Sequence, residues 1–206
     1  MTDLIDKIHF QDLSERDPKE VCRRASCKYD DINELYKLSV WGDEYRICPN
    51  QSKIDCMGNN TQGLHDYFYL FIIHYLLKSK EIEISNEWIS EKDIPGGTAF
   101  FRGPHEIPTN LISIRFSNNI DEFKKRCEQL NGKPINMADA AYSFWIAPRI
   151  PVAVLYWLGD EDFPAESKIL YDKTISEHLA SDIIYALGVG ICERLGKPHG
   201  KEYVSL

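Results

Sequence analysis

Apolar and polar residues alternate over residues 35–48, and this pattern predicts a β-hairpin. The polar pair Gly42-Asp43 lies between the two alternating runs and suits a turn. A period of two residues is typical of a strand with one buried face. We therefore expect an antiparallel strand pair near the start of the chain. Its apolar residues are Tyr36, Leu38, Val40, Tyr45 and Ile47.

Helical spacing and capping residues predict four helices. The start of the first is well marked, because Asp17 can cap it, Pro18 suits the first helical position and Glu20 completes the capping pattern. The last contains Gly188 and Gly190, each of which costs about 1 kcal/mol relative to alanine, so we expect a neighbouring element close to its backbone. The helices are expected over about 18–27, 64–78, 120–130 and 181–195, with Asn119 and Ser181 as caps of the last two.

A second strand pair is predicted between residues 141 and 158. Pro148 and Pro151 divide this apolar segment into two strands joined by a corner. The second strand, Val152 to Leu158, is apolar at every position, which is typical of a central strand covered on both faces. Residues 111–116 are a further short strand candidate.

Together these segments predict an α+β fold. We expect a mixed, largely antiparallel sheet with an amino-terminal hairpin, packed against about four helices. The length of 206 residues suits a single domain. We place that domain over residues 1–206, with short flexible ends at about 1–15 and 197–206 and a polar loop at 59–63.

Composition and charge narrow the classes of function. The chain has 24 Lys and Arg against 32 Asp and Glu, a formal net charge of −8. This balance argues against nucleic acid as a partner and against docking on an anionic membrane. The apolar runs are shorter than the roughly 18 residues of a membrane span, and the acidic start is unlike a secretory signal. We therefore expect a cytoplasmic protein with no membrane partner.

The six cysteines are expected to be reduced thiols in that compartment. Four of them lie early in the chain, where four thiolates could hold zinc or an iron–sulfur cluster. The spacing argues against this, since a helix that ran to Cys27 would place Cys22 and Cys27 roughly 140° apart around its axis. We favour ordinary thiols and keep the metal site as the less favoured alternative. Its four residues are Cys22, Cys27, Cys48 and Cys56.

Two charged loops form the candidate binding site. An arginine stands in the stiff corner between the two prolines, where it could clamp a carboxylate or phosphate. Three acids follow the central strand and could meet a cation or a polar ligand, although a solvated acidic turn is the interpretation we favour for them. A bridge between the arginine and these acids is as well supported as ligand binding. The candidates are Arg149, Asp160, Glu161 and Asp162, with Arg102 as a weaker one.

Several ordered motifs resemble one family. The corner at 148–151, the acidic loop at 159–165 and the strand Ile169 to Asp172 are similar to the carboxy-terminal signature of domain-of-unknown-function family 3786. The segment from Trp88 to Gly97 and the hairpin at 35–48 also resemble it. The resemblance extends roughly from Asp17 to Leu195.

The resemblance brings no catalytic residues. It implies an association with anaerobic bacteria and archaea. Some members are joined to an iron–sulfur module, which implies a link to the corrinoid proteins of one-carbon metabolism. For this chain a corrinoid or other metallocofactor is therefore an association through the family alone.

Two hypotheses of different classes follow. The favoured one is a binding or accessory protein that holds a small molecule, a cofactor, or a partner protein that carries a cofactor. The alternative is an enzyme that acts on a small anionic substrate through Arg149 and the acids at 160–162. The enzyme hypothesis requires these side chains to converge on a concave surface. The sequence leaves the oligomeric state open.

Overall fold

The computed structural model describes residues 5–58 and 65–197, and the predicted polar loop at 59–63 lies outside them. Within the described residues the chain forms two antiparallel sheets, with strand orders β1-β2-β3-β4 and β5-β9-β8-β7-β6, so the fold class is α+β as predicted. The strands are β1 (Lys28–Asp30), β2 (Leu35–Val40), β3 (Asp43–Cys48), β4 (Lys53–Cys56), β5 (Trp88–Ile89), β6 (Lys133–Pro134), β7 (Ala140–Ala147), β8 (Ile150–Trp157) and β9 (Glu166–Asp172). The helices are α1 (Lys7–Ser14), α2 (Pro18–Ala25), α3 (Asp66–Lys78), α4 (Gly97–Phe100), α5 (Asn110–Phe116), α6 (Ile120–Gln129), α7 (Ile175–His178) and α8 (Ser181–Gly196).

The predicted hairpin is β2 and β3, and it belongs to the smaller sheet instead of the main one. Its apolar residues are buried as the alternation predicts. The turn is Trp41-Gly42 and not Gly42-Asp43, because Val40 pairs with Asp43. Both turn residues have positive φ, 48° and 85°, as a two-residue hairpin turn requires. The Trp41 amide donates to Ile146 O of β7 at 2.9 Å, which ties this turn to the second sheet.

The second sheet contains the predicted strand pair and its corner. β7 and β8 pair antiparallel, and β8 is the central strand of the five. Every residue of β8 except Trp157 is buried, which confirms the prediction of a strand covered on both faces. The corner at Pro148 and Arg149 and the acidic loop at 158–165 therefore lie at opposite ends of the same strand.

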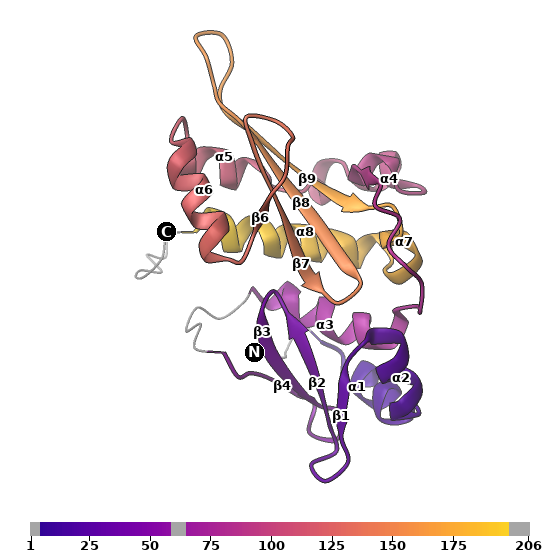
Figure 1. Ribbon diagram of the computed structural model, residues 1–206. Helices are drawn as coiled ribbons and strands as arrows, with labels where there is room; N and C mark the ends of the chain where they lie inside the picture. Colours follow the sequence, from indigo (N-terminus) through magenta and orange to yellow (C-terminus); the bar gives the residue numbers. More distant parts are fainter. Residues whose placement is uncertain (1–4, 59–64, 198–206) are drawn as a thin grey trace, which may run out of the picture.

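Two long helices carry much of the packing. Figure 1 shows α3 at the level where the two sheets meet and α8 running across one face of the second sheet. The glycines of α8 are the points of close approach that the sequence predicts. A Cβ on Gly190 would lie 2.4 Å from the Phe68 ring of α3, and a Cβ on Gly188 would lie 2.8 Å from the Tyr171 hydroxyl of β9. Within the described residues, no helix combines the length and apolar character that a membrane span requires.

Gly190→Ala is expected to destabilise the protein by up to about 2 kcal/mol, although alanine is the better helix former. Overpacking a filled core costs about 1–3 kcal/mol, which exceeds the gain of about 1 kcal/mol in helix propensity. Phe68 is fully buried against Trp41 and cannot move aside without cost. Urea unfolding measures the effect. In a Phe68→Leu background the same substitution should cost less, and an equal cost in both backgrounds would contradict this contact as the cause.

Three local predictions differ from the structure. Residues 111–116 fall in helix α5 and not in a strand, because Ile112 and Phe116 are buried four residues apart while Ile114 is 71% exposed. In the sequence, apolar Ile112, Ile114 and Phe116 fit the period of a strand. Packing against α8 selects the helix instead, and Leu111 O lies beside Gly196. Helix α8 begins after Ala180, and its cap makes no side-chain hydrogen bond, so Ser181 does not act as predicted. Residues 7–14, expected within a flexible end, form α1 with Phe10 and Leu13 buried.

Candidate functional site

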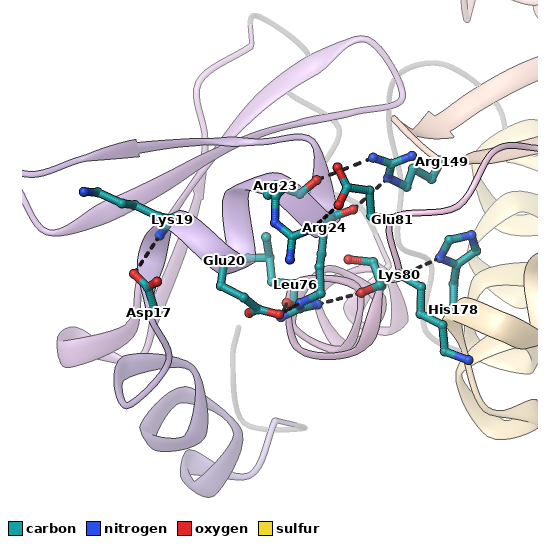
Figure 2. A network of polar contacts seen from close by, with 11 residues as sticks. Asp17, Lys19, Glu20, Arg23, Arg24, Leu76, Lys80, Glu81, Arg149 and His178 are labelled. Atoms are coloured by element: carbon teal, nitrogen blue, oxygen red, sulfur yellow. Dashed lines mark hydrogen bonds and ion pairs between the residues drawn. The ribbon is translucent and has the colours of Figure 1, made fainter.

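Arg149 uses its guanidinium to hold main-chain carbonyl groups. Its Nε donates to Arg24 O at 2.7 Å and its Nη2 to Arg23 O at 3.4 Å (Figure 2). Its Nη1 donates to Ile82 O at 3.0 Å. Two of these acceptors are in the last turn of α2, where carbonyl groups have no partner within the helix. The stiff corner therefore presents Arg149 to another part of the same chain. All three guanidinium nitrogens are occupied in this way.

Arg24 caps the end of another helix in the same manner. Arg24 of α2 donates to Ser79 O at 2.6 Å and to Leu76 O at 3.5 Å, at the end of α3, and it also pairs with Glu20. Figure 2 shows the resulting series, in which Arg149 holds α2 and α2 in turn holds α3. Positive charge at a helix carboxyl end is stabilising. These arginines are accordingly part of the architecture.

The acidic loop does not meet Arg149. It joins β8 to β9 at the far end of β8, and Asp160, Glu161 and Asp162 are exposed on it. Asp160 Oδ1 accepts from the amides of Asp162 at 2.9 Å and Phe163 at 2.8 Å, and these hydrogen bonds lower the pKa of that carboxyl. The carboxylate thus closes its own turn. The convergence that the enzyme hypothesis requires is absent from the structure, because the two groups lie at opposite ends of an eight-residue strand.

Arg102 lies apart from both loops in the sequence and makes no side-chain hydrogen bond to the described residues. It is exposed, in the turn that follows α4. The neighbouring Phe101 lines a small polar cavity of about 180 Å³, but Arg102 itself is not among the lining residues.

The early cysteines separate into a pair and two single thiols. Cys22 and Cys27 have their sulfur atoms 3.6 Å apart. The expected separation around a helix is wrong, because α2 ends at Ala25 and Ser26 adopts a left-handed φ of 51° that turns the chain back. Cys48 and Cys56 lie at the ends of β3 and β4. Across the described ranges, no group of three or more His, Cys, Asp or Glu side chains is placed to hold a metal ion.

The larger cavity lies between the end of α3 and the start of α8. Its volume is about 440 Å³, within the range of small-molecule sites. Its apolar wall is formed by Leu179 and Ala180, between α7 and α8, and by Ile183 of α8, and titratable groups surround it. The titratable residues that line it are His74, Lys78, Lys80, Glu177, His178 and Asp182.

Both histidines of this cavity stay neutral at physiological pH. Burial lowers the pKa of His178 to about 4, and the charges of Arg149 and Lys80 act in the same direction. Burial, with His9 at a ring-centroid distance of 4.5 Å, lowers the pKa of His74 to about 4. His178 Nδ1 accepts from the Lys80 amide at 3.1 Å, and its Nε2 is buried with no hydrogen-bond partner in the described chain. Sequence reasoning gave no signal for His178.

These histidines make stability depend on pH. The ordinary pKa of 6.5 applies in the unfolded chain, so unfolded molecules take up these protons first as the pH falls. The stabilising contribution is fully present above pH 6.5 and is lost between pH 6.5 and about 4, at up to about 1.4 kcal/mol per pH unit for each histidine. Urea unfolding across this range measures the slope. His178→Asn should reduce it, whereas the same change at the exposed His105 should not.

A buried carboxylate fixes the segments beside the cavity. Asp172, 3% exposed at the end of β9, accepts from the amides of Ser85, Asn86 and Thr174 at 2.7–3.0 Å. The hydroxyl groups of Ser85 and Thr174 donate to it as well. Burial alone would raise the pKa of Asp172, but the hydrogen bonds outweigh burial and lower it. The sequence offers no local signal for this network, since Ser85 and Asp172 are 87 residues apart.

Comparison with known proteins identifies a family. The family model described as "Domain of unknown function (DUF3786)" matches residues 17–194. No curated protein matches the chain. No solved structure matches it either. The matched segment covers the two sheets, the Arg149 corner and the larger cavity, and this chain belongs to the DUF3786 family.

Proposed function

We propose that this protein is a cytoplasmic binding protein for a small organic anion with an apolar group and one carboxylate. The ligand is held in the cavity between α3, α7 and α8. The observation that carries the proposal is the combination of a 440 Å³ cavity, an apolar wall and a lysine at its edge, Lys78, that forms no ion pair with a described residue. Sites of this kind use apolar contacts for affinity and a few polar groups for orientation.

Two lysines and two acids, Glu177 and Asp182, line the cavity, and Lys78 is the group among them that would bind an anion. Lys80 is paired with Glu177 at 2.7 Å, so its charge is already matched. Lys78 forms no ion pair with any residue of the described chain and is exposed at the carboxyl end of α3. The neutral His74 lies one helical turn before Lys78 and can donate or accept a hydrogen bond. In the proposed complex the carboxylate of the ligand contacts Lys78 and His74, and its apolar group packs against Leu179 and Ile183.

The other hypotheses from the sequence receive less support. The enzyme hypothesis depended on Arg149 meeting the acids at 160–162, and these groups lie at opposite ends of β8. A corrinoid, with its large ring and long appendages, exceeds a cavity of about 440 Å³. Under this proposal, a link to corrinoid-dependent metabolism in anaerobes would have to run through a partner protein that carries the cofactor.

Titration with hexanoate and benzoate, followed by the histidine ring proton resonances, tests the proposal. We expect saturable shifts of the His74 and His178 resonances. Lys78→Gln should weaken binding about tenfold, which corresponds to the loss of roughly one charged contact. Lys19→Gln, at an exposed lysine on α2, should leave binding unchanged. Absence of saturable shifts with both probes, or equal binding by the Lys78→Gln protein, would contradict the proposal.

A further inference from the structure

The turn after α2 holds two thiols within contact distance. The Cys22 and Cys27 sulfur atoms are 3.6 Å apart, and both side chains are half-buried against the core. The remaining cysteines are placed differently: Cys48 and Cys56 are single thiols on the smaller sheet, and Cys127 and Cys192 are buried in helices. Among the six cysteines, all of which lie in the described residues, Cys22 and Cys27 are the two whose sulfur atoms are in contact.

The main chain fixes this pair in place. The Cys27 amide donates to Cys22 O at 3.1 Å, and the left-handed Ser26 reverses the direction of the chain between them. Outside the turn, the Tyr75 hydroxyl donates to Ala25 O at 3.0 Å, and Arg149 holds the two preceding carbonyl groups. These hydrogen bonds fix the conformation of the turn, and the turn in turn keeps the two sulfurs in contact. A disulfide bond of about 2.0 Å needs the two sulfurs to approach by roughly 1.5 Å more.

We propose that Cys22 and Cys27 are a redox-active dithiol that is oxidised reversibly to an intramolecular disulfide by disulfides of low molecular weight. Preorganisation favours this pairing over others, since the folded chain already holds the two sulfurs together.

The chemistry assigns different roles to the two thiols. The Cys27 thiol donates a hydrogen bond to the Cys22 sulfur, which favours the thiolate on Cys22. The Cys22 thiolate attacks one sulfur of the small disulfide, the bond between its two sulfurs breaks, and one thiolate leaves. Cys27 then loses its proton and attacks the Cys22 sulfur, which releases the second thiolate. The protein loses two electrons and two protons, and the small disulfide becomes two thiols.

Burial affects the rate of this reaction. It raises the pKa of Cys22, an effect that the hydrogen bond from Cys27 opposes, and it raises the pKa of Cys27 further. Thiolate is the reactive form, so oxidation should accelerate as the pH rises above neutral.

The sequence makes the test direct, because trypsin cleaves after Arg23 and Arg24, between the two cysteines. The reduced full chain is equilibrated with oxidised glutathione, quenched in acid, alkylated in denaturant and digested without reductant. We expect a species in which the peptide of residues 20–23 is joined to that of residues 25–28 by a disulfide. It should exceed any other cysteine pairing at least tenfold and disappear on treatment with dithiothreitol.

Three variants complete the test. Cys27→Ser should retain a glutathione adduct on Cys22, and Cys22→Ser should form an adduct on Cys27 at least tenfold more slowly. Cys48→Ser, which removes another half-buried thiol of the same region, should form the disulfide as the natural chain does. Full alkylation of both Cys22 and Cys27 after equilibration overturns the proposal. A disulfide from either residue to Cys48 or Cys56 also overturns it.

Discussion

Replacing Arg149 by methionine is expected to lower the free energy of unfolding by about 3 kcal/mol, since hydrogen bonds from charged donors contribute about 1.5–3 kcal/mol each and water replaces part of this set. The substitution keeps the length of the side chain and removes the donors to Arg23 O, Arg24 O and Ile82 O. The end of α2 then has unpaired carbonyl groups and lacks the Arg149 charge, although Arg23 and Arg24 remain in its last turn. Urea unfolding at pH 7.5 measures the loss.

A second readout distinguishes the loss of the hydrogen bonds from Arg149 from a general loss of stability. The charge of Arg149 contributes to the low pKa of His178, so that pKa should rise in the folded Arg149→Met protein. Arg102→Met is the matched control, because Arg102 is exposed and its stability change should stay within about 0.5 kcal/mol. Equal decreases in the free energy of unfolding from the two substitutions would contradict the role of Arg149 in holding the end of α2.

Asp172→Ala should be at least as damaging, with an expected loss of about 3–5 kcal/mol, because it leaves several partly buried donors without an acceptor. The carboxylate accepts five hydrogen bonds from Ser85, Asn86 and Thr174. Without it, the segment before β5 and the start of α7 lose their common anchor. Asp172→Asn should cost less than Asp172→Ala, because one acceptor oxygen remains. Thermal and urea unfolding measure both.

The pH dependence gives an independent check on Asp172. Its pKa is lowered in the folded protein, so the unfolded chain takes up a proton first as the pH falls. The stabilising contribution is fully present above the ordinary value of 3.8 and is lost as the pH falls through the lower folded value. Asp172→Asn should remove this part of the acid sensitivity. Asp12→Ala, at an exposed residue of α1, should change neither stability nor its pH dependence, and a similar effect there would contradict the assignment.

The local patterns of the chain determined much of the secondary structure. Asn119 caps α6 by accepting from the Glu122 amide, as the sequence predicts, and Asn131 with a positive φ follows the helix. The hairpin of β2 and β3 and the fully covered β8 follow from the spacing of apolar residues. Features of this kind depend on residues within a few positions of one another, so one sequence is sufficient to predict them.

The candidate sites depended on contacts that the sequence does not express. The Arg149 corner was predicted, but its partner Arg24 is 125 residues away, and α2 occupies the place that a ligand was expected to fill. The helix that was expected to separate Cys22 from Cys27 ends two residues early and brings their sulfurs together. His178 joins His74 at one cavity because α7 packs beside the end of α3. The periodicity of the sequence indicates which side chains are buried. The residues that these side chains contact depend on how the elements pack, and packing minimises the free energy of the whole chain.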